Sequence, residues 1–299
     1  MARYRSWVLP FAIVAGIFLH EYLSLLNVLI PYLIFSILLL NFSSFSLSRF
    51  KVSGMDVIFM TFQIVVSMGL YMIFRPVSEV FAQGLLVGII CPVAASVAAV
   101  ACILGANRER VMTYTLLGNM MVTIVAPIYF SFVGNNVDMP FLKSFGLIFS
   151  KIFPIIVLPM LVDMGLKRVW PSAKLFLIKT RGMSFYLWAL ALMITIGKTI
   201  GFIFEYKGVY PMLIVALIVA SGVMCAIQFW VGKSVGSRYG DRIAGGQNLG
   251  QRNSALGIWM AYTYLDPMSS IFPAAYSIWQ NLFNSYQLYR HDKKANYQK

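Results

Sequence analysis

Residues 243–264 read IAGGQNLGQRNSALGIWMAYTY, an apolar stretch of membrane-helix length with a glycine-rich, polar centre. A helix of about 20 apolar residues crosses a bilayer. At that depth, unwound backbone is tolerated only where protein or a water-filled cavity surrounds it. We therefore expect residues 245–254 to interrupt a membrane helix and to face the protein interior.

A second interruption lies at residues 89–96, IICPVAAS, within the apolar run at about 83–105. Pro92 removes a backbone donor and clashes with the preceding helical turn. A single proline often only kinks a membrane helix, and a glycine-rich stretch often only allows close helix packing. The matched positions favour a functional reading, because paired interruptions in corresponding spans mark the binding site of many transporters.

The composition predicts a polytopic membrane protein. Of 299 residues, 60% are hydrophobic and 11% charged, against about 45–50% and about 25% in soluble domains. This excludes a soluble enzyme, a disordered chain and a membrane protein with a large soluble domain. Ten apolar runs of membrane-helix length occur, at about 7–25, 27–47, 54–74, 83–105, 110–133, 145–166, 184–204, 211–232, 243–264 and 267–288.

The ten runs divide into two halves of five. We predict a first repeat over 1–134, a second over 135–290 and a cytoplasmic tail over 291–299, with the boundary in the polar segment 135–138. An odd number of spans per half requires the second half to enter the membrane from the opposite face. The predicted fold is thus all-α, with ten transmembrane helices in two inverted five-helix repeats.

The basic excess has a topological explanation. Eighteen of the 24 Lys and Arg residues fall on the side of the membrane that holds the N-terminus, whereas four fall on the opposite side. Cytoplasmic loops carry such an excess, so both termini are predicted to be cytoplasmic. A nucleic-acid partner is therefore not expected. The three cysteines lie in apolar runs without metal-binding spacing, so neither a metal site nor a disulfide is predicted.

Arg252 is the one charge predicted at mid-membrane. It lies about ten residues into its span, which places it ~15 Å from either surface at 1.5 Å per residue. Burial of an arginine there costs about 2.5–3.5 kcal/mol, so we expect it to face the interior and to have a partner or a function. All the carboxylates predicted within spans map near span ends, which leaves intramembrane amides such as Gln63, Asn119, Asn248 and Asn281 as candidate partners.

Three segments resemble the bile acid:sodium symporter family, whose bacterial members include bile-acid-transporter homologues and pantoate transporters. Residues 87–92 (VGIICP) are similar to the entry into the family's first crossing helix. Residues 246–256 (GQNLGQRNSAL) are similar to its glycine, glutamate, glycine, glutamine-asparagine-serine pattern. Residues 273–282 (PAAYSIWQNL) are similar to its last span.

The resemblance implies a core of spans 3–5 and 8–10, in which two broken helices cross at mid-membrane, and a panel of spans 1, 2, 6 and 7. A small or amphipathic organic anion, bile-acid-like or a carboxylate, would bind between them in a bacterial inner membrane, and alternating access would follow from their relative motion. By the same resemblance, substrate contacts fall on Ala95, Asn253, Gln280 and Asn281. For the three polar residues, the alternative role is hydrogen bonding between helices.

The first sodium site of the family is degraded in this chain. An ungapped alignment from Cys91 and Pro92 places Val97, Ala98 and Val111 where the family has polar ligands, and keeps only Thr115. Hard cations need several oxygen ligands, and valine supplies none.

The second sodium site is changed as well. The glutamate shared by both sites falls on Asn248, the glutamine of the second falls on Arg252, and Gln63 keeps its place. We therefore question the usual sodium coupling. Our hypothesis is that the guanidinium of Arg252 occupies the space of the second sodium as a fixed cation, held by Gln63, Asn248 and backbone carbonyls.

Two other functional classes are alternatives to an anion carrier. An intramembrane enzyme for diphosphate substrates would need acidic metal-binding clusters, and the chain has no DxxD motif; we predict that it is not an enzyme and needs no organic cofactor. A channel or a non-transporting sensor of the same fold is the alternative to a carrier.

Overall fold

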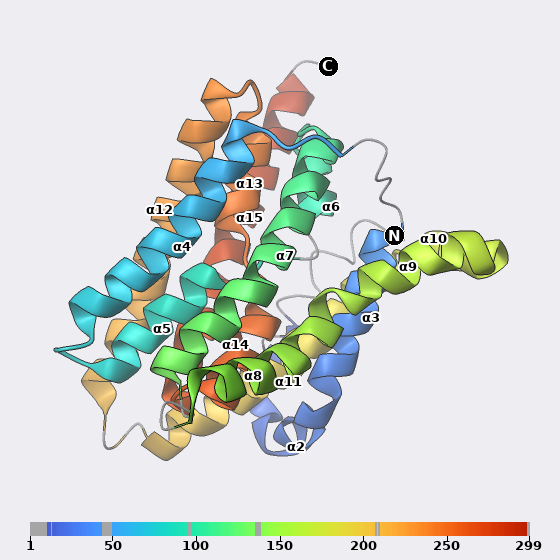
Figure 1. The fold of residues 1–299 in the computed structure, drawn as a ribbon. Helices are drawn as coiled ribbons and strands as arrows, with labels where there is room; N and C mark the ends of the chain where they lie inside the picture. The colour runs from blue at the N-terminus through green and yellow to red at the C-terminus, as the bar shows by residue number, and fades with distance from the viewer. Residues whose placement is uncertain are drawn as a thin grey trace.

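The computed structural model describes residues 11–12, 14–43, 50–94, 97–134, 139–206, 208 and 210–297, and nearly all of them are helical (Figure 1). These residues contain no β-strand. The elements in chain order are α2 (His20–Leu25), η1 (Leu26–Leu29), α3 (Ile30–Phe42), α4 (Gly54–Phe74), α5 (Glu79–Ile90), α6 (Val97–Ile103), α7 (Arg108–Val133), α8 (Phe141–Ile156), α9 (Leu158–Val169), α10 (Pro171–Thr180), α11 (Met183–Tyr206), α12 (Pro211–Arg238), α13 (Arg242–Gly250), α14 (Ser254–Tyr264), η3 (Pro267–Ser270) and α15 (Ile271–Tyr297).

Several helices have the length and composition of membrane spans. Within the described residues, α4, α7, α11 and α12 qualify singly, and α8 and α9 qualify together as a pair bent by 44°. The all-helical class and the presence of helices long and apolar enough to span a membrane are therefore confirmed. The count of ten spans and the sidedness of the termini stay predictions, and the start of the first span and the predicted boundary at 135–138 lie outside the described residues.

Helix α4 shows how the sequence specifies these elements. Ser53 and Asp56 form a capping box, in which the Ser53 backbone N–H and hydroxyl each donate to Asp56 Oδ2 at 2.8 Å. An uninterrupted apolar run then continues the helix to Phe74. Buried residues recur every four positions along one face of α4, which directs Gln63 into the protein: Met55, Phe59, Gln63, Ser67 and Tyr71.

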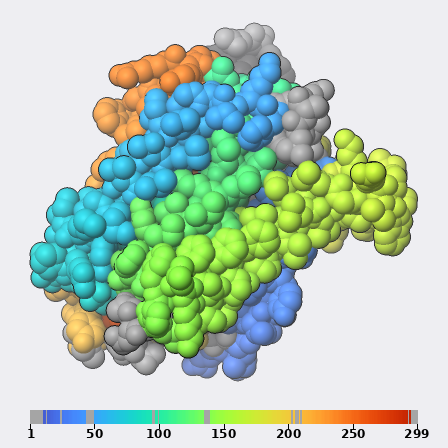
Figure 2. Space-filling model, in the orientation of Figure 1, coloured from blue at the N-terminus to red at the C-terminus, as the bar shows by residue number. Residues whose placement is uncertain are grey.

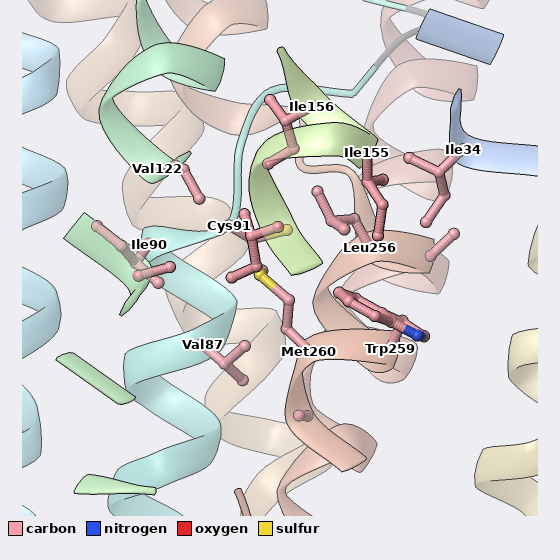
Figure 3. Packing of buried hydrophobic residues seen from close by; sticks show 14 of the residues in the cluster. Ile34, Val87, Ile90, Cys91, Val122, Ile155, Ile156, Leu256, Trp259 and Met260 are labelled. Atoms are coloured by element: carbon pink, nitrogen blue, oxygen red, sulfur yellow. The ribbon is translucent and has the colours of Figure 1, made fainter. Parts of the chain in front are cut away.

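The helices form two groups that meet along an apolar seam. In the first group, α4 packs on α5 and α7, and α12 packs on α5, α13 and α15. In the second, α11 packs on α2 and α3, and α3 packs on α8 and α9 (Figure 1). Figure 3 shows the apolar seam, in which side chains from α5, α7 and α14 face those from α3 and α8. The labelled members are Ile34, Val87, Ile90, Cys91, Val122, Ile155, Ile156, Leu256, Trp259 and Met260.

The glycines before Arg252 serve packing, which corrects one prediction. Helix α13 continues to Gly250, so an interruption that begins at Gly245 is wrong. A Cβ atom on Gly245 would lie 2.3 Å from the carbonyl oxygen of Gly232 and 2.6 Å from Cα of Gly236. The backbones of α12 and α13 therefore touch at these glycines, and only residues 251–253 leave the helical path.

Candidate functional site

Two non-helical segments, residues 91–94 and 251–253, cross each other and pair through their backbones; together they are called the crossing. Asn253 N–H donates to the Pro92 carbonyl at 2.8 Å, and Ala94 N–H donates to the Gln251 carbonyl at 3.3 Å. Val93 and Arg252 form an isolated antiparallel bridge at the same place. Each non-helical segment thus supplies hydrogen-bond partners for backbone groups of the other. Unwound chain in an apolar interior needs such partners, because water is not there to replace them.

Arg252 lies at the crossing with 1% of its surface exposed and is the largest of the fully buried side chains described. Its Nε donates to Gln228 Oε1 at 2.7 Å, and its Nη1 donates to the Cys91 carbonyl at 3.3 Å. Nη2 has no hydrogen-bond partner among the described residues. Because Cys91 follows the C-terminus of α5, the negative end of that helix dipole faces the guanidinium.

Gln280 of α15 holds the backbone of Arg252. Arg252 N–H donates to Gln280 Oε1 at 2.7 Å, and Gln280 Nε2 donates to the Arg252 carbonyl at 3.1 Å. The buried amide therefore replaces the two helical hydrogen bonds that the break removes. It fixes the direction in which the Arg252 side chain leaves the backbone.

Gln63 lies beside Arg252 but does not bind it. Its Nε2 donates to the carbonyls of Ile89 at 3.1 Å and Cys91 at 3.2 Å, and its Oε1 accepts from the Tyr114 hydroxyl. Gln63 and Arg252 thus share the Cys91 carbonyl as acceptor. Of the predicted contacts to the guanidinium, the one from a backbone carbonyl is present.

The predicted contacts from Gln63 and Asn248 side chains to the guanidinium are wrong. The side-chain partner is Gln228 of α12, a fully buried residue that the sequence analysis missed. It lies beside the break because α12 packs closely on α13. The available signal was a lone amide within the apolar run 211–232.

Asn248 is fully buried, and neither atom of its amide has a hydrogen-bond partner among the described residues. Thr115 is also buried, but its hydroxyl donates to the Val111 carbonyl of its own helix at 2.8 Å. Val93, Val97 and Val111 belong to one apolar cluster near these residues. At the positions that the resemblance gives to sodium ligands, Val97 and Val111 supply no oxygen, and Arg252 places a guanidinium where the resemblance expects an amide.

Of the four residues predicted to contact substrate, two lie at the crossing, one bonds within its own helix, and one is outside the described residues. Asn253 Oδ1 caps α14 by accepting from Leu256 N–H at 3.3 Å, and Gln280 holds Arg252 as described. Asn281 donates to the Ser277 carbonyl of its own helix at 2.8 Å. Ala95 lies outside the described residues. Asn253 and Gln280 therefore meet at the crossing, and no hydrogen bond described here links Asn281 to it.

Comparison with known proteins leaves the family open: no family model matches the chain, and no curated protein is significantly similar to it. Among the described residues, no group of three or more His, Cys, Asp or Glu side chains is arranged to hold a metal ion. The family and the function therefore have to be inferred from the crossing and its residues.

Proposed function

We propose that the chain is a secondary transporter of a small or amphipathic organic anion, similar to the bile acid:sodium symporter family and located in a bacterial inner membrane. The observation that carries this proposal is the crossing, where two interrupted helices pair through their backbones around a buried arginine. Interrupted helices at a shared site are the recurrent binding-site design of secondary transporters.

The helix order supports an inverted-repeat carrier. In each half, a long apolar helix (α4 or α12) precedes an interrupted pair (α5 and α6, or α13 and α14) and a second long helix (α7 or α15). These helices would form the core and α2, α3, α8, α9 and α11 the panel, with α7 and α8 in close contact across the boundary between them. Motion of one group against the other along the apolar seam would give alternating access.

Arg252 would act as a fixed cation in the place of a sodium ion. Its guanidinium donates to the Cys91 carbonyl at the C-terminus of α5, a position that favours positive charge. The same charge, together with the N-terminus of α14 that begins two residues later, would attract an anionic substrate to the crossing. No sodium ion is then needed to assemble the site.

Transport in proteoliposomes tests this function. Carboxylate and sulfonate anions, including taurocholate and pantoate, would first be screened for a rise in the thermal stability of the solubilised protein, because a ligand stabilises the state that binds it. Uptake of the most stabilising anion would then be measured with all sodium replaced by potassium. We expect saturable uptake that persists in potassium.

Two variants and two outcomes make this test decisive. Arg252→Gln should abolish saturable uptake, whereas Lys143→Gln, which removes an exposed cation of α8, should leave it unchanged. Strict dependence on sodium would refute the fixed-cation mechanism. If no anion stabilises the protein and none is taken up, the carrier itself is refuted.

A channel-like protein or a non-transporting sensor of the same fold is the second candidate function. The sensor is favoured by the packed apolar seam, where Ile155, Ile156 and Trp259 lie at the contact between the two helix groups, because such a contact offers an anion no polar path (Figure 3). Counterflow separates the candidates, because only a carrier exchanges labelled for unlabelled anion across the membrane. Uptake without counterflow would favour the channel.

A further inference from the structure

Helix α10 protrudes from the rest of the protein (Figures 1 and 2). Its main contacts are with α9 and α3. With 10 residues it is too short to cross a bilayer, which takes about 20. The helix therefore has a large outward surface that the surrounding protein leaves uncovered.

The outward surface of α10, and of the two residues that precede it, is apolar. Val169, Trp170, Leu175 and Phe176 each expose more than half of their residue surface, with 62% for Trp170 and 63% for Phe176. Tryptophan and phenylalanine on the face of a short helix are typical of segments that lie in the interface plane of a membrane.

The same segment is strongly basic. Residues 164–183 contain five Lys or Arg residues and no Asp or Glu. Lys174 is partly buried and forms an ion pair with Asp163 of α9, in which its Nζ lies 2.5 Å from Asp163 Oδ2. The other four cations are exposed: Lys167, Arg168, Lys179 and Arg181.

Lys179 and two exposed apolar residues share one face of α10. Lys179 follows Leu175 by four positions and Phe176 by three, so the three side chains are neighbours on the helix surface. A lysine stem can cover apolar surface while its ammonium group reaches outward to a charged layer. This arrangement matches the boundary between acyl chains and phosphate groups.

We propose that the outward face of α10 binds the headgroup region of anionic phospholipids. Leu175, Phe176 and Trp170 would insert at the level of the upper acyl chains, and the four exposed cations would contact the lipid phosphates. The ion pair between Lys174 and Asp163 ties α10 to α9, which packs on α3. Bound lipid would therefore fix the position of α10, and through it α9, relative to the membrane surface.

Hydrogen exchange of the full-length protein in nanodiscs tests this proposal. Amide exchange of residues 172–180 would be compared in phosphatidylcholine alone and in phosphatidylcholine with phosphatidylglycerol. A third sample would contain neutral nanodiscs with inorganic phosphate, which separates lipid headgroups from free anion. We expect slower exchange with phosphatidylglycerol only.

Matched double variants identify the cations responsible. Each basic residue near an anionic surface contributes about 1 kcal/mol, which corresponds to roughly a fivefold change for each charge removed. Lys179→Gln with Arg181→Gln should therefore weaken the lipid-dependent protection by more than tenfold. Lys143→Gln with Lys151→Gln, which removes two exposed cations of α8, should leave it intact.

Three results would overturn the proposal: equal exchange in the neutral and anionic nanodiscs, protection by inorganic phosphate alone, or equal effects of the two double variants. None of these measurements depends on transport. Failure here therefore leaves the proposed carrier function untouched, and failure of uptake leaves the lipid site untouched.

Discussion

The pairing of Arg252 with Gln228 predicts an unusual order of stabilities among three proteins. Gln228→Leu removes the acceptor of Arg252 Nε, now at 2.7 Å, but keeps the buried charge. Replacement of both residues, Arg252→Met with Gln228→Leu, removes the charge together with its acceptor. We expect the double variant to be more stable than the single one.

The magnitudes follow from the contacts. A hydrogen bond to a charged group contributes about 1.5–3 kcal/mol, and loss of one partner leaves the other buried without compensation. Gln228→Leu also removes the amide Nε2, which has no partner among the described residues, and this offsets part of the loss. The net destabilisation is about 2 kcal/mol. Buried ionic groups replaced together by apolar residues are neutral or stabilising, so the double variant should lie within about 1 kcal/mol of the natural protein.

Thermal unfolding of the three solubilised proteins in one detergent, followed by uptake in proteoliposomes, measures both consequences. The double variant should regain stability and still fail to transport, because the fixed cation is gone. If it unfolds at or below the temperature of Gln228→Leu, the stability of the guanidinium does not depend on Gln228. If it is stable and transports, Arg252 is not the functional cation.

Two further pairs of variants test the packing around the break by thermal unfolding. Gly245→Ala should destabilise by about 1–3 kcal/mol because its Cβ would meet the Gly232 carbonyl, whereas Gly146→Ala, which faces open space, should be neutral or gain up to about 1 kcal/mol. Gln280→Leu leaves the Arg252 N–H unpaired, whereas the Arg252 carbonyl still accepts from the Ser254 N–H, and it should cost about 1–3 kcal/mol. Asn281→Leu loses one hydrogen bond within its own helix and should cost less than about 1 kcal/mol. The reverse order in either pair would contradict the assigned contacts.

The sequence predicted the helical class and the location of both interruptions because these depend on local properties. Hydrophobic run length gave the limits 54–74 for α4, which the structure has at Gly54–Phe74. Pro92 marked the first break correctly, since α5 ends at Ile90. The second break was predicted too long, because glycine permits both unwinding and close helix contact. Only the neighbouring α12 backbone decides between the two.

The candidate site was predicted in part. Burial of Arg252 followed from its depth in an apolar run, and its contact with a backbone carbonyl is present. Its amide partner was assigned to Gln63 and Asn248, yet it is Gln228. A long-range contact of this kind depends on how α12 rotates against α13, and no local pattern encodes that rotation. The position of Gln280 against the Arg252 backbone was unforeseen for the same reason.

The crossing also bears on how the protein is made. The backbone groups of Pro92 and Ala94 find their partners on Asn253 and Gln251, which a ribosome adds about 160 residues later at roughly 5–20 residues per second. If the chain enters a bilayer as it is made, the first half carries during those seconds polar groups that nothing yet pairs, at several kcal/mol each in a lipid environment. The newly made first half is therefore an incomplete intermediate, and its survival until the last helices arrive depends on water, on the insertion machinery or on a neighbouring chain.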